Sequence, residues 1–329
     1  MKAEVRVSMG TFAETKISVV MNQIFWNAYK RLERELLSLS EDIHFDDDQL
    51  KVYSSKIGDL LVRTVIEIEA LAKNLFFANE GTQPEDRDLY FDTDCLKLLE
   101  DKWLLSKKQV MVVSPFFYFT KSENRTLSPL QKASKRGTSG ARWKQAYQAV
   151  KHDRVNNLKK GNIGNLLNAL AALYVLNVYD RGASFYLDDD YEGRKIEWGL
   201  GSEIFAVKVS RENRNPSDEA EYVKKRDYEE CIYLVKPTDG EIKRYLELLR
   251  TIRQETRQES AKVVGQILEE KKKTGEFPTD QNELNRLIEA LFAQNNRESL
   301  QRVGERHLLE IRKVFSELRF EAVLNKNQY

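Results

Sequence analysis

The sequence predicts a mainly α-helical protein in which a helical bundle is followed by a small β-rich segment and a C-terminal helical region. Long stretches carry apolar residues at spacings of three and four, which is the repeat of an amphipathic helix. Residues 163–179 are apolar on most sides, as expected of a helix at the centre of a bundle. After residue 180, short runs rich in β-branched and aromatic residues interrupt the helical pattern. The length of 329 residues favours two domains.

Apolar repeats and capping signals place the elements along the chain. In chain order, they predict helices over residues 18–39, 46–79, 93–105, 141–158, 163–179, 239 to a break at 275–278, 282–293 and 297–324. Three short strands, at residues 183–187, 204–209 and 231–235, are expected to form a small antiparallel sheet or a β-rich insertion.

These elements define the expected domains. The helical bundle covers residues 1–180 with a basic insertion at about 84–141, the β-rich segment covers 181–238, and the C-terminal helices cover 239–329. The polar, basic segment 121–140 is expected to be a loop that is mobile or ordered by a ligand.

Composition excludes several classes of protein. Cys95 and Cys231 lie far apart in the sequence, so a disulfide scaffold or a cysteine-based zinc site is not expected. The longest uninterrupted apolar run, residues 169–176, is too short to span a bilayer, and the first residues have no apolar core of signal-peptide length. We therefore expect a cytoplasmic protein without a membrane partner.

Charge is segregated along the chain although the net charge is only +1. Residues 33–101 contain 18 acidic and 7 basic residues, whereas residues 102–160 contain 14 basic and 2 acidic ones. The basic segment could attract phosphates if folding gathers its charges on one face. Alternatively, the acidic and basic segments neutralise each other within one domain.

The densest polar cluster is the helix that contains W-K-Q-A-Y-Q-A-V-K-H-D-R, residues 143–154. His152 follows a row of amide side chains and lies beside Lys151 and Arg154, which favour its neutral imidazole form. A base next to cations suits a phosphate-handling or RNA-cleaving site, with His152, Arg154 and Lys151 as catalytic candidates. The alternative is that His152 ties the helix to an acidic neighbour while Trp143 and Tyr147 pack in the core.

Other cations of the basic segment are candidates for nucleic-acid binding. They are Arg142, Lys144, Lys135, Arg136, Lys159 and Lys160.

Three segments together resemble the HEPN superfamily over roughly residues 18–180. They are E-I-E-A-L-A-K-N-L at 67–75, W-K-Q-A-Y-Q-A-V-K-H-D-R at 143–154 and the helix N-L-L-N-A-L-A-A-L-Y-V-L-N at 165–177. The resemblance implies a helical bundle that dimerises, and in many members a metal-independent endoribonuclease of bacterial defence, abortive-infection or toxin–antitoxin systems.

The family's catalytic pattern is an arginine followed, after four to six residues, by a histidine. His152 matches the histidine, but Tyr147 stands at the expected arginine position and Arg142 is too far away. A literal match, Arg302 to His307, lies in a regular amphipathic helix and is interpreted as a chance match.

We expect no cofactor and no metal. The sequence contains no phosphate-binding glycine loop and no zinc-protease or hydrolase motif, and His44 beside three aspartates matches no known metal loop.

Three functions agree with these features. The first is a defence-type protein that binds RNA or a nucleotide and cleaves RNA through His152. The second is a non-catalytic HEPN-like binding or regulatory module, either a homodimer or a subunit of a larger defence assembly. The third is a structural helical scaffold whose charges neutralise one another.

Overall fold

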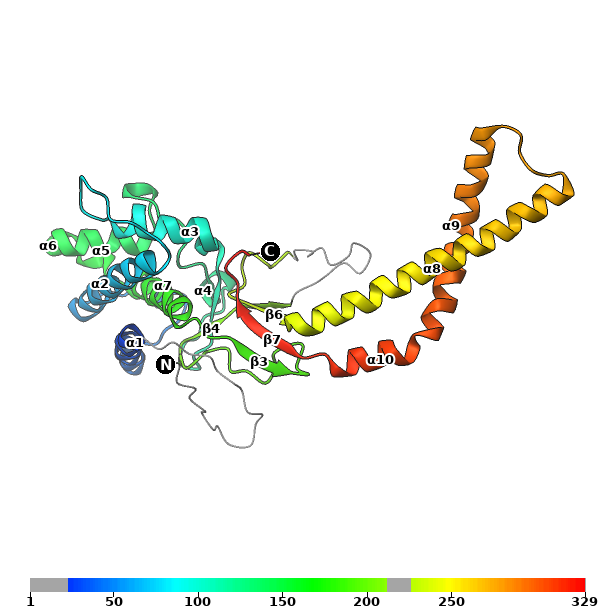
Figure 1. The fold of residues 1–329 in the computed structure, drawn as a ribbon. Coiled ribbons are helices and arrows are strands. Elements are labelled where there is room, and N and C mark those ends of the chain that lie inside the picture. The colour runs from blue at the N-terminus through cyan, green and yellow to red at the C-terminus, as the bar shows by residue number, and fades with distance from the viewer. Residues whose placement is uncertain (1–22, 212–225, 329) are drawn as a thin grey trace, which may run out of the picture. The chain divides into compact units, whose positions relative to one another are not determined.

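The computed structural model describes residues 23–211 and 226–328, which are mainly helical (Figure 1). Residues 23–211, 226–236 and 321–328 form one compact unit, and residues 237–320 form a second. The predicted class, a helical bundle with a small β segment and C-terminal helices, is confirmed. The first residues of the helix predicted from residue 18 lie outside the described part of the chain.

The first unit is built from seven α-helices and several shorter turns among its described residues. The helices are α1 (Ile24–Asp42), α2 (Ser55–Ala78), α3 (Lys97–Trp103), α4 (Ser122–Arg125), α5 (Arg142–His152), α6 (Arg154–Asn157) and α7 (Ile163–Arg181). The turns are the 3₁₀-helices η1 (Gln49–Lys51), η3 (Leu105–Lys107), η4 (Gly137–Ser139) and η5 (Leu158–Lys160), and the π-helix η2 (Phe91–Leu96).

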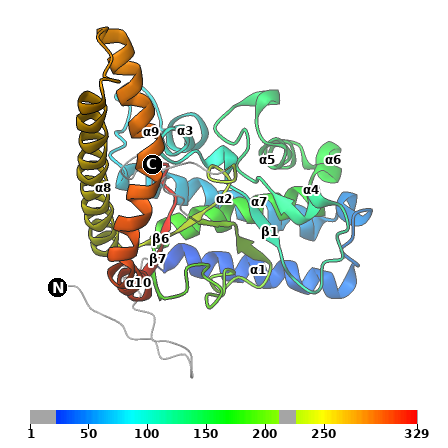
Figure 2. The same cartoon turned by 90° about the vertical axis from the view of Figure 1, so that its right-hand side faces the viewer.

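Helix α7 lies at the centre of this unit, as its all-round apolar sequence predicts. It packs against α1, α2 and α5 (Figures 1 and 2), and 14 of its 19 residues are buried. Just before it, η5 lies against the beginning of α2. A Cβ atom on Gly161 would lie 2.8 Å from the Cα atom of Gly58, so glycine is required for this close approach.

The predicted start of the second helix at residue 46 is wrong. The side chain of Asp46 accepts hydrogen bonds from the backbone N–H groups of Asp48 and Gln49, both at 2.9 Å, and so forms a local turn before η1. Helix α2 begins nine residues later, where Ser54 Oγ caps it by accepting a hydrogen bond from Ile57 N–H at 3.2 Å.

The strands form two small sheets. They are β1 (Val110–Val112), β2 (Thr126–Leu127), β3 (Phe185–Asp188), β4 (Phe205–Val207), β5 (Val209–Arg211), β6 (Tyr233–Pro237) and β7 (Phe320–Leu324). The sheets combine strands from the segment 181–238 with β1, β2 and β7 from outside it. One sheet has the order β2-β1-β4 and is antiparallel, and the other has the order β3-β7-β6-β5. Strands β5 and β6 are parallel, which differs from the antiparallel sheet that is one of the two expectations for this segment.

The second unit consists of α8 (Asp239–Thr274), α9 (Gln281–Arg306) and α10 (Leu308–Glu317). Helix α8 ends at Thr274, and the next residue, Gly275, has a left-handed φ of 77°, which favours glycine. The break predicted at residues 275–278 is therefore confirmed at its first residue. The two helices predicted over 282–293 and 297–324 are not separated at that point, because α9 continues through residues 294–296. The last part of the second predicted helix is strand β7.

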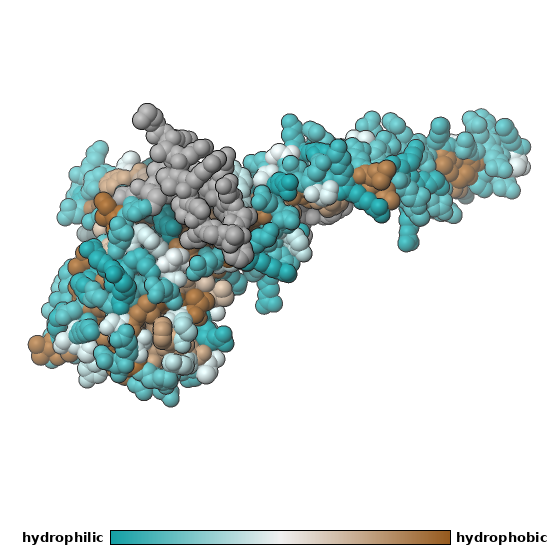
Figure 3. All heavy atoms as spheres, turned by 90° about the horizontal axis from the view of Figure 1, so that it is seen from below, coloured by the Kyte–Doolittle hydropathy of each residue, from teal (hydrophilic) through white to brown (hydrophobic). Residues whose placement is uncertain are grey.

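Helices α8, α9 and α10 share a small core of Leu248, Ile252, Val303 and Val314. On the face shown in Figure 3, apolar side chains of the α8–α9 hairpin form small groups between polar ones. No helix in the described ranges has both the length and the apolarity needed to cross a membrane.

Candidate nucleic-acid interface

Helix α5 carries the polar cluster found in the sequence, and its two buried aromatic residues fix its orientation. Trp143 and Tyr147 are buried, and Trp143 Nε1 donates a hydrogen bond to the carbonyl of Pro129 at 2.8 Å. These two residues pack in the core, as the alternative interpretation of the cluster expects. The acidic neighbour that it also expects for His152 is replaced by the amide of Gln148.

An ionic cluster lies at the N-terminal end of α5, around Asp92 of η2. The ammonium of Lys144 is 3.0 Å from one carboxylate oxygen of Asp92, and Nε of Arg136 is 2.9 Å from the other. Burial lowers the pKa of Lys144, against the opposing effect of Asp92. For Asp92, burial raises the pKa, but the bonds from Lys144 and Arg136 outweigh it and leave a net lowering. We name this group, Asp92, Arg136 and Lys144, the Asp92 cluster.

The Asp92 cluster also ties down the loop that was expected to be mobile or ligand-ordered. Lys144 donates to the carbonyl oxygens of Ala133, at 2.9 Å, and of Lys135. Gln145 donates to the carbonyl of Gly140 at 2.7 Å. This segment is therefore bonded to the protein itself, and Lys144, with its side chain 5% exposed, is not positioned to contact a phosphate.

Two of the predicted nucleic-acid-binding residues at this end of α5 are exposed and lie outside the Asp92 cluster. Arg142 and Lys135 have exposed side chains, whereas the guanidinium of Arg136 lies 3.6 Å from the ring centre of Tyr90 as well as bonding Asp92.

The C-terminal end of α5 presents the predicted catalytic residues. His152 is exposed, and its Nε2 atom is 3.1 Å from Oε1 of Gln148, one helical turn before it. Lys151 is exposed as well, and its ammonium donates to the hydroxyl of Tyr147 at 3.1 Å. This bond, with the nearby Glu69 carboxylate, raises the pKa of Lys151. Tyr147 thus occupies the expected arginine position with a buried ring and a bonded hydroxyl.

Arg154 begins α6 directly after the break at Asp153, and it pairs with α2. Its Nη1 atom lies 2.5 Å from a carboxylate oxygen of Asp59, and both side chains are about half exposed. Asp153 caps α6 by accepting a hydrogen bond from the Asn156 N–H. Arg154 therefore has a carboxylate partner, whereas among the described residues His152 bonds only the amide of Gln148.

Lys159 and Lys160 of η5 complete this end of the bundle. Both side chains are exposed, and within the described ranges neither ammonium forms an ion pair. The contact of Gly161 with Gly58 holds η5 against α2. We define the α5–η5 surface as the exposed side chains of Lys151, His152, Arg154, Lys159 and Lys160.

The acidic segment neutralises part of the basic segment. Four ion pairs join residues 33–101 to residues 102–160: Asp92–Lys144, Asp92–Arg136, Asp59–Arg154 and Glu80–Lys102. Only one of these four pairs involves the α5–η5 surface, so that surface keeps most of its positive charge.

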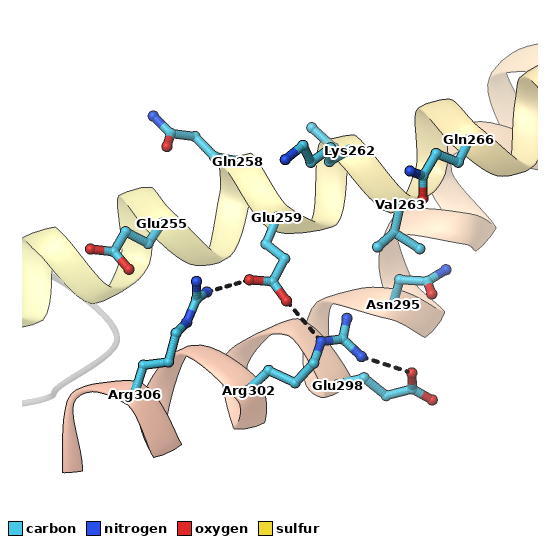
Figure 4. A pocket seen from close by; sticks show the side chains of 11 residues that line it. Glu255, Gln258, Glu259, Lys262, Val263, Gln266, Asn295, Glu298, Arg302 and Arg306 are labelled. Carbon is cyan, nitrogen blue, oxygen red and sulfur yellow. Dashed lines mark hydrogen bonds and ion pairs between the residues drawn. The ribbon is translucent and has the colours of Figure 1, made fainter.

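A groove of about 1040 Å³ lies between α8 and α9 of the second unit (Figure 4). On its wall, Glu259 of α8 accepts a hydrogen bond from Nε of Arg302 at 2.7 Å and another from Arg306. Arg302 also lies 3.7 Å from Glu298. Four charged residues of this groove, Glu259, Glu298, Arg302 and Arg306, thus bond to each other, and Glu259 links the two helices.

The literal arginine–histidine match is part of the same interhelical network. Arg302 bonds Glu259, and the two ring nitrogens of His307 lie 3.1 Å from Glu255 and from Glu310. The hydrogen bonds to these two carboxylates raise the pKa of His307. Both residues hold helices together, in keeping with the interpretation of a chance match.

Side chains that could bind a metal have other contacts. The ring of His44 stacks on Tyr118 with 4.3 Å between ring centres, and Asp47 accepts hydrogen bonds from the loop around residue 120. Cys95 and Cys231 are buried, which raises their pKa values to about 12 and about 11. Within residues 23–211 and 226–328, no three His, Cys, Asp or Glu side chains gather as a metal site would require.

No family model, curated protein or solved structure matches this chain.

Proposed function

We propose that this chain is a HEPN-like RNA-binding protein, of the kind found in bacterial defence, whose phosphate-binding site is the α5–η5 surface. The observation that carries the proposal is the pair of exposed ammonium groups of Lys159 and Lys160, which have no ion-pair partner in the described chain and share a surface with exposed His152. Such a group of cations attracts the phosphate backbone of RNA without reading its sequence.

RNA cleavage at this surface would depend on His152. An exposed imidazole can take a proton from a ribose hydroxyl, and adjacent cations can stabilise the charge on the phosphate. Lys151 and Arg154 are the nearest candidates along the chain, but they bond Tyr147 and Asp59 respectively. These two bonds favour a second candidate function, a non-catalytic module that binds RNA and regulates a partner protein.

The binding proposal is tested by the salt dependence of affinity for a single-stranded RNA of about 12 nucleotides. Each phosphate contact contributes about 0.7 to the slope of log affinity against log salt. Replacing both lysines, Lys159→Gln with Lys160→Gln, is expected to lower the slope by about 1.4. The matched control is Lys272→Gln with Lys273→Gln, two adjacent exposed lysines at the end of α8. No salt dependence in the wild type would refute RNA binding at this surface.

Cleavage is tested separately with total RNA in EDTA. If His152 acts as the base, the wild type produces fragments that end in a cyclic phosphate and His152→Ala does not. Binding without fragments in either protein would support the non-catalytic function instead.

A further inference from the structure

An exposed tyrosine stands on a rigid segment next to the α5–η5 surface. Tyr53 lies between η1 and α2, and 52% of it is exposed. Its backbone pairs with Asn162 in an antiparallel bridge, and the carbonyl of the preceding Val52 accepts a hydrogen bond from Ile163 N–H at 3.0 Å. The following residue, Ser54, caps α2. The backbone of Tyr53 is thus fixed on both sides while its ring faces solvent.

Four lysines lie close to Tyr53, two along the chain and two near the residue bridged to it. Lys51 and Lys56 lie two residues before and three residues after Tyr53, so their Cα atoms are within about 11 Å of its own. Lys159 and Lys160 shortly precede Asn162, the residue paired with Tyr53. All four side chains are exposed, and none forms an ion pair with any residue in the described ranges.

The combination of one exposed aromatic ring and several cations is the chemistry that binds single-stranded nucleic acid. A base stacks on the ring, and ammonium groups bind the phosphates on either side of that base. In a duplex the bases are already stacked and paired, so the ring has no face to contact.

We propose that Tyr53 stacks on an unpaired base of RNA while Lys51, Lys56, Lys159 and Lys160 bind the flanking phosphates. The inference rests on the proposed RNA binding and adds its preference for single strands. Tyr53 is a binding residue, distinct from the residues assigned to cleavage.

The test compares Tyr53→Leu with Tyr53→Phe, which keeps an aromatic ring. Fluorescence anisotropy measures binding to three RNAs of about 12 nucleotides: a single strand, the same strand without bases at its central positions, and a duplex. Tyr53→Leu is expected to weaken single-strand binding by about fivefold to a hundredfold, and Tyr53→Phe by less than about threefold. The matched control is Tyr186→Leu, a tyrosine of β3 that is 51% exposed.

The strand without central bases separates stacking from phosphate binding. This strand is expected to bind the wild type and Tyr53→Leu with equal affinity, because it offers no central base to stack on the tyrosine ring. The stacking role is refuted, and the proposed function stands, if the wild type binds the single strand, Lys159→Gln with Lys160→Gln weakens that binding, and Tyr53→Leu does not. If the wild type binds none of the three RNAs, the proposed function itself is refuted. A change in oligomeric state with unchanged RNA affinity in Tyr53→Leu would assign the ring to a protein interface and overturn the inference.

Discussion

The two ends of helix α5 use cations from the same basic stretch of sequence in opposite ways. At the N-terminal end, Lys144 is buried and bonded to Asp92 and to two loop carbonyls. At the C-terminal end, Lys151 and His152 are exposed, and the cations of η5 follow them. Lys144 and Lys151 are seven residues apart and lie on nearly the same side of the helix. Their burial differs because the loop before α5 covers only Lys144.

The net charge of +12 over residues 102–160, from 14 basic and 2 acidic residues, therefore serves two different roles. One part holds the loop to the bundle, and another part remains at the surface for a polyanion to bind. Mutations at the two ends should therefore separate stability from RNA affinity.

The largest expected effect is the loss of stability in Asp92→Ala. This change leaves the buried ammonium of Lys144 without its carboxylate, and breaking one partner of a buried ion pair costs about 3–5 kcal/mol. Urea unfolding should report this decrease in the free energy of unfolding, with RNA affinity of the folded protein unchanged.

The double variant Asp92→Leu with Lys144→Met serves as the control, because removing both charges should recover much of the lost stability. Since the pKa of Asp92 is lowered in the folded protein, its contribution is present at neutral pH and is lost as pH falls through that lowered value. A loss below about 1 kcal/mol in Asp92→Ala would mean that the cluster is not structural.

The sequence predicts the central helix better than it predicts elements whose structure depends on partners distant in the sequence. Helix α7 is correctly placed because its apolar residues leave no polar side, and this property needs no knowledge of its neighbours. Strand β7 is missed because five residues in Phe320–Leu324 fit either a helix end or a strand. Only its partners β3 and β6, which lie far away in the sequence, decide between them.

The same limit applies to the candidate site. His152, Lys159 and Lys160 are exposed as a polar, basic helix end suggests, whereas the burial of Lys144 depends on a loop that periodicity does not describe. The sequence does not indicate Asp59 as the partner of Arg154, because their contact requires the packing of α5 and η5 against α2. Tyr53 carries no motif, and its position next to η5 depends on the bridge to Asn162.

Residues 102–160 contain a second buried lysine, Lys108, whose hydrogen-bond acceptor is a carbonyl where Lys144 has the carboxylate of Asp92. Lys108 is 1% exposed and donates to the carbonyl of Glu229 at 3.0 Å, and burial lowers its pKa from 10.5 to about 8. Between these values the folded chain has released a proton that the unfolded chain still binds, so stability rises with pH. We expect a gain of roughly 2–3 kcal/mol from pH 7 to pH 10.5, measured as the difference from Lys108→Met in urea unfolding.

The neighbouring exposed lysine provides the control for this titration. Lys107→Met removes a lysine charge from the same stretch and leaves buried Lys108 in place, so the gain in stability with pH should remain in this variant. A constant difference between the wild type and Lys108→Met over this pH range would show that the Lys108 ammonium is not destabilised by burial.

The smallest expected effect tests the C-terminal end of α5 through Asp59→Asn. This change removes the carboxylate that pairs with Arg154, and because both side chains are about half exposed, it should cost less than about 1 kcal/mol of stability. Arg154 then becomes available to RNA, and the local charge rises by one. The salt slope should steepen by about 0.7, with a tighter affinity at low salt.

The control is Asp101→Asn, which breaks the exposed pair with Lys97. It should match the stability change without altering RNA binding. Weaker RNA binding by Asp59→Asn would instead mean that Asp59 positions Arg154 for the phosphate, and the α5–η5 surface would then include this acidic residue.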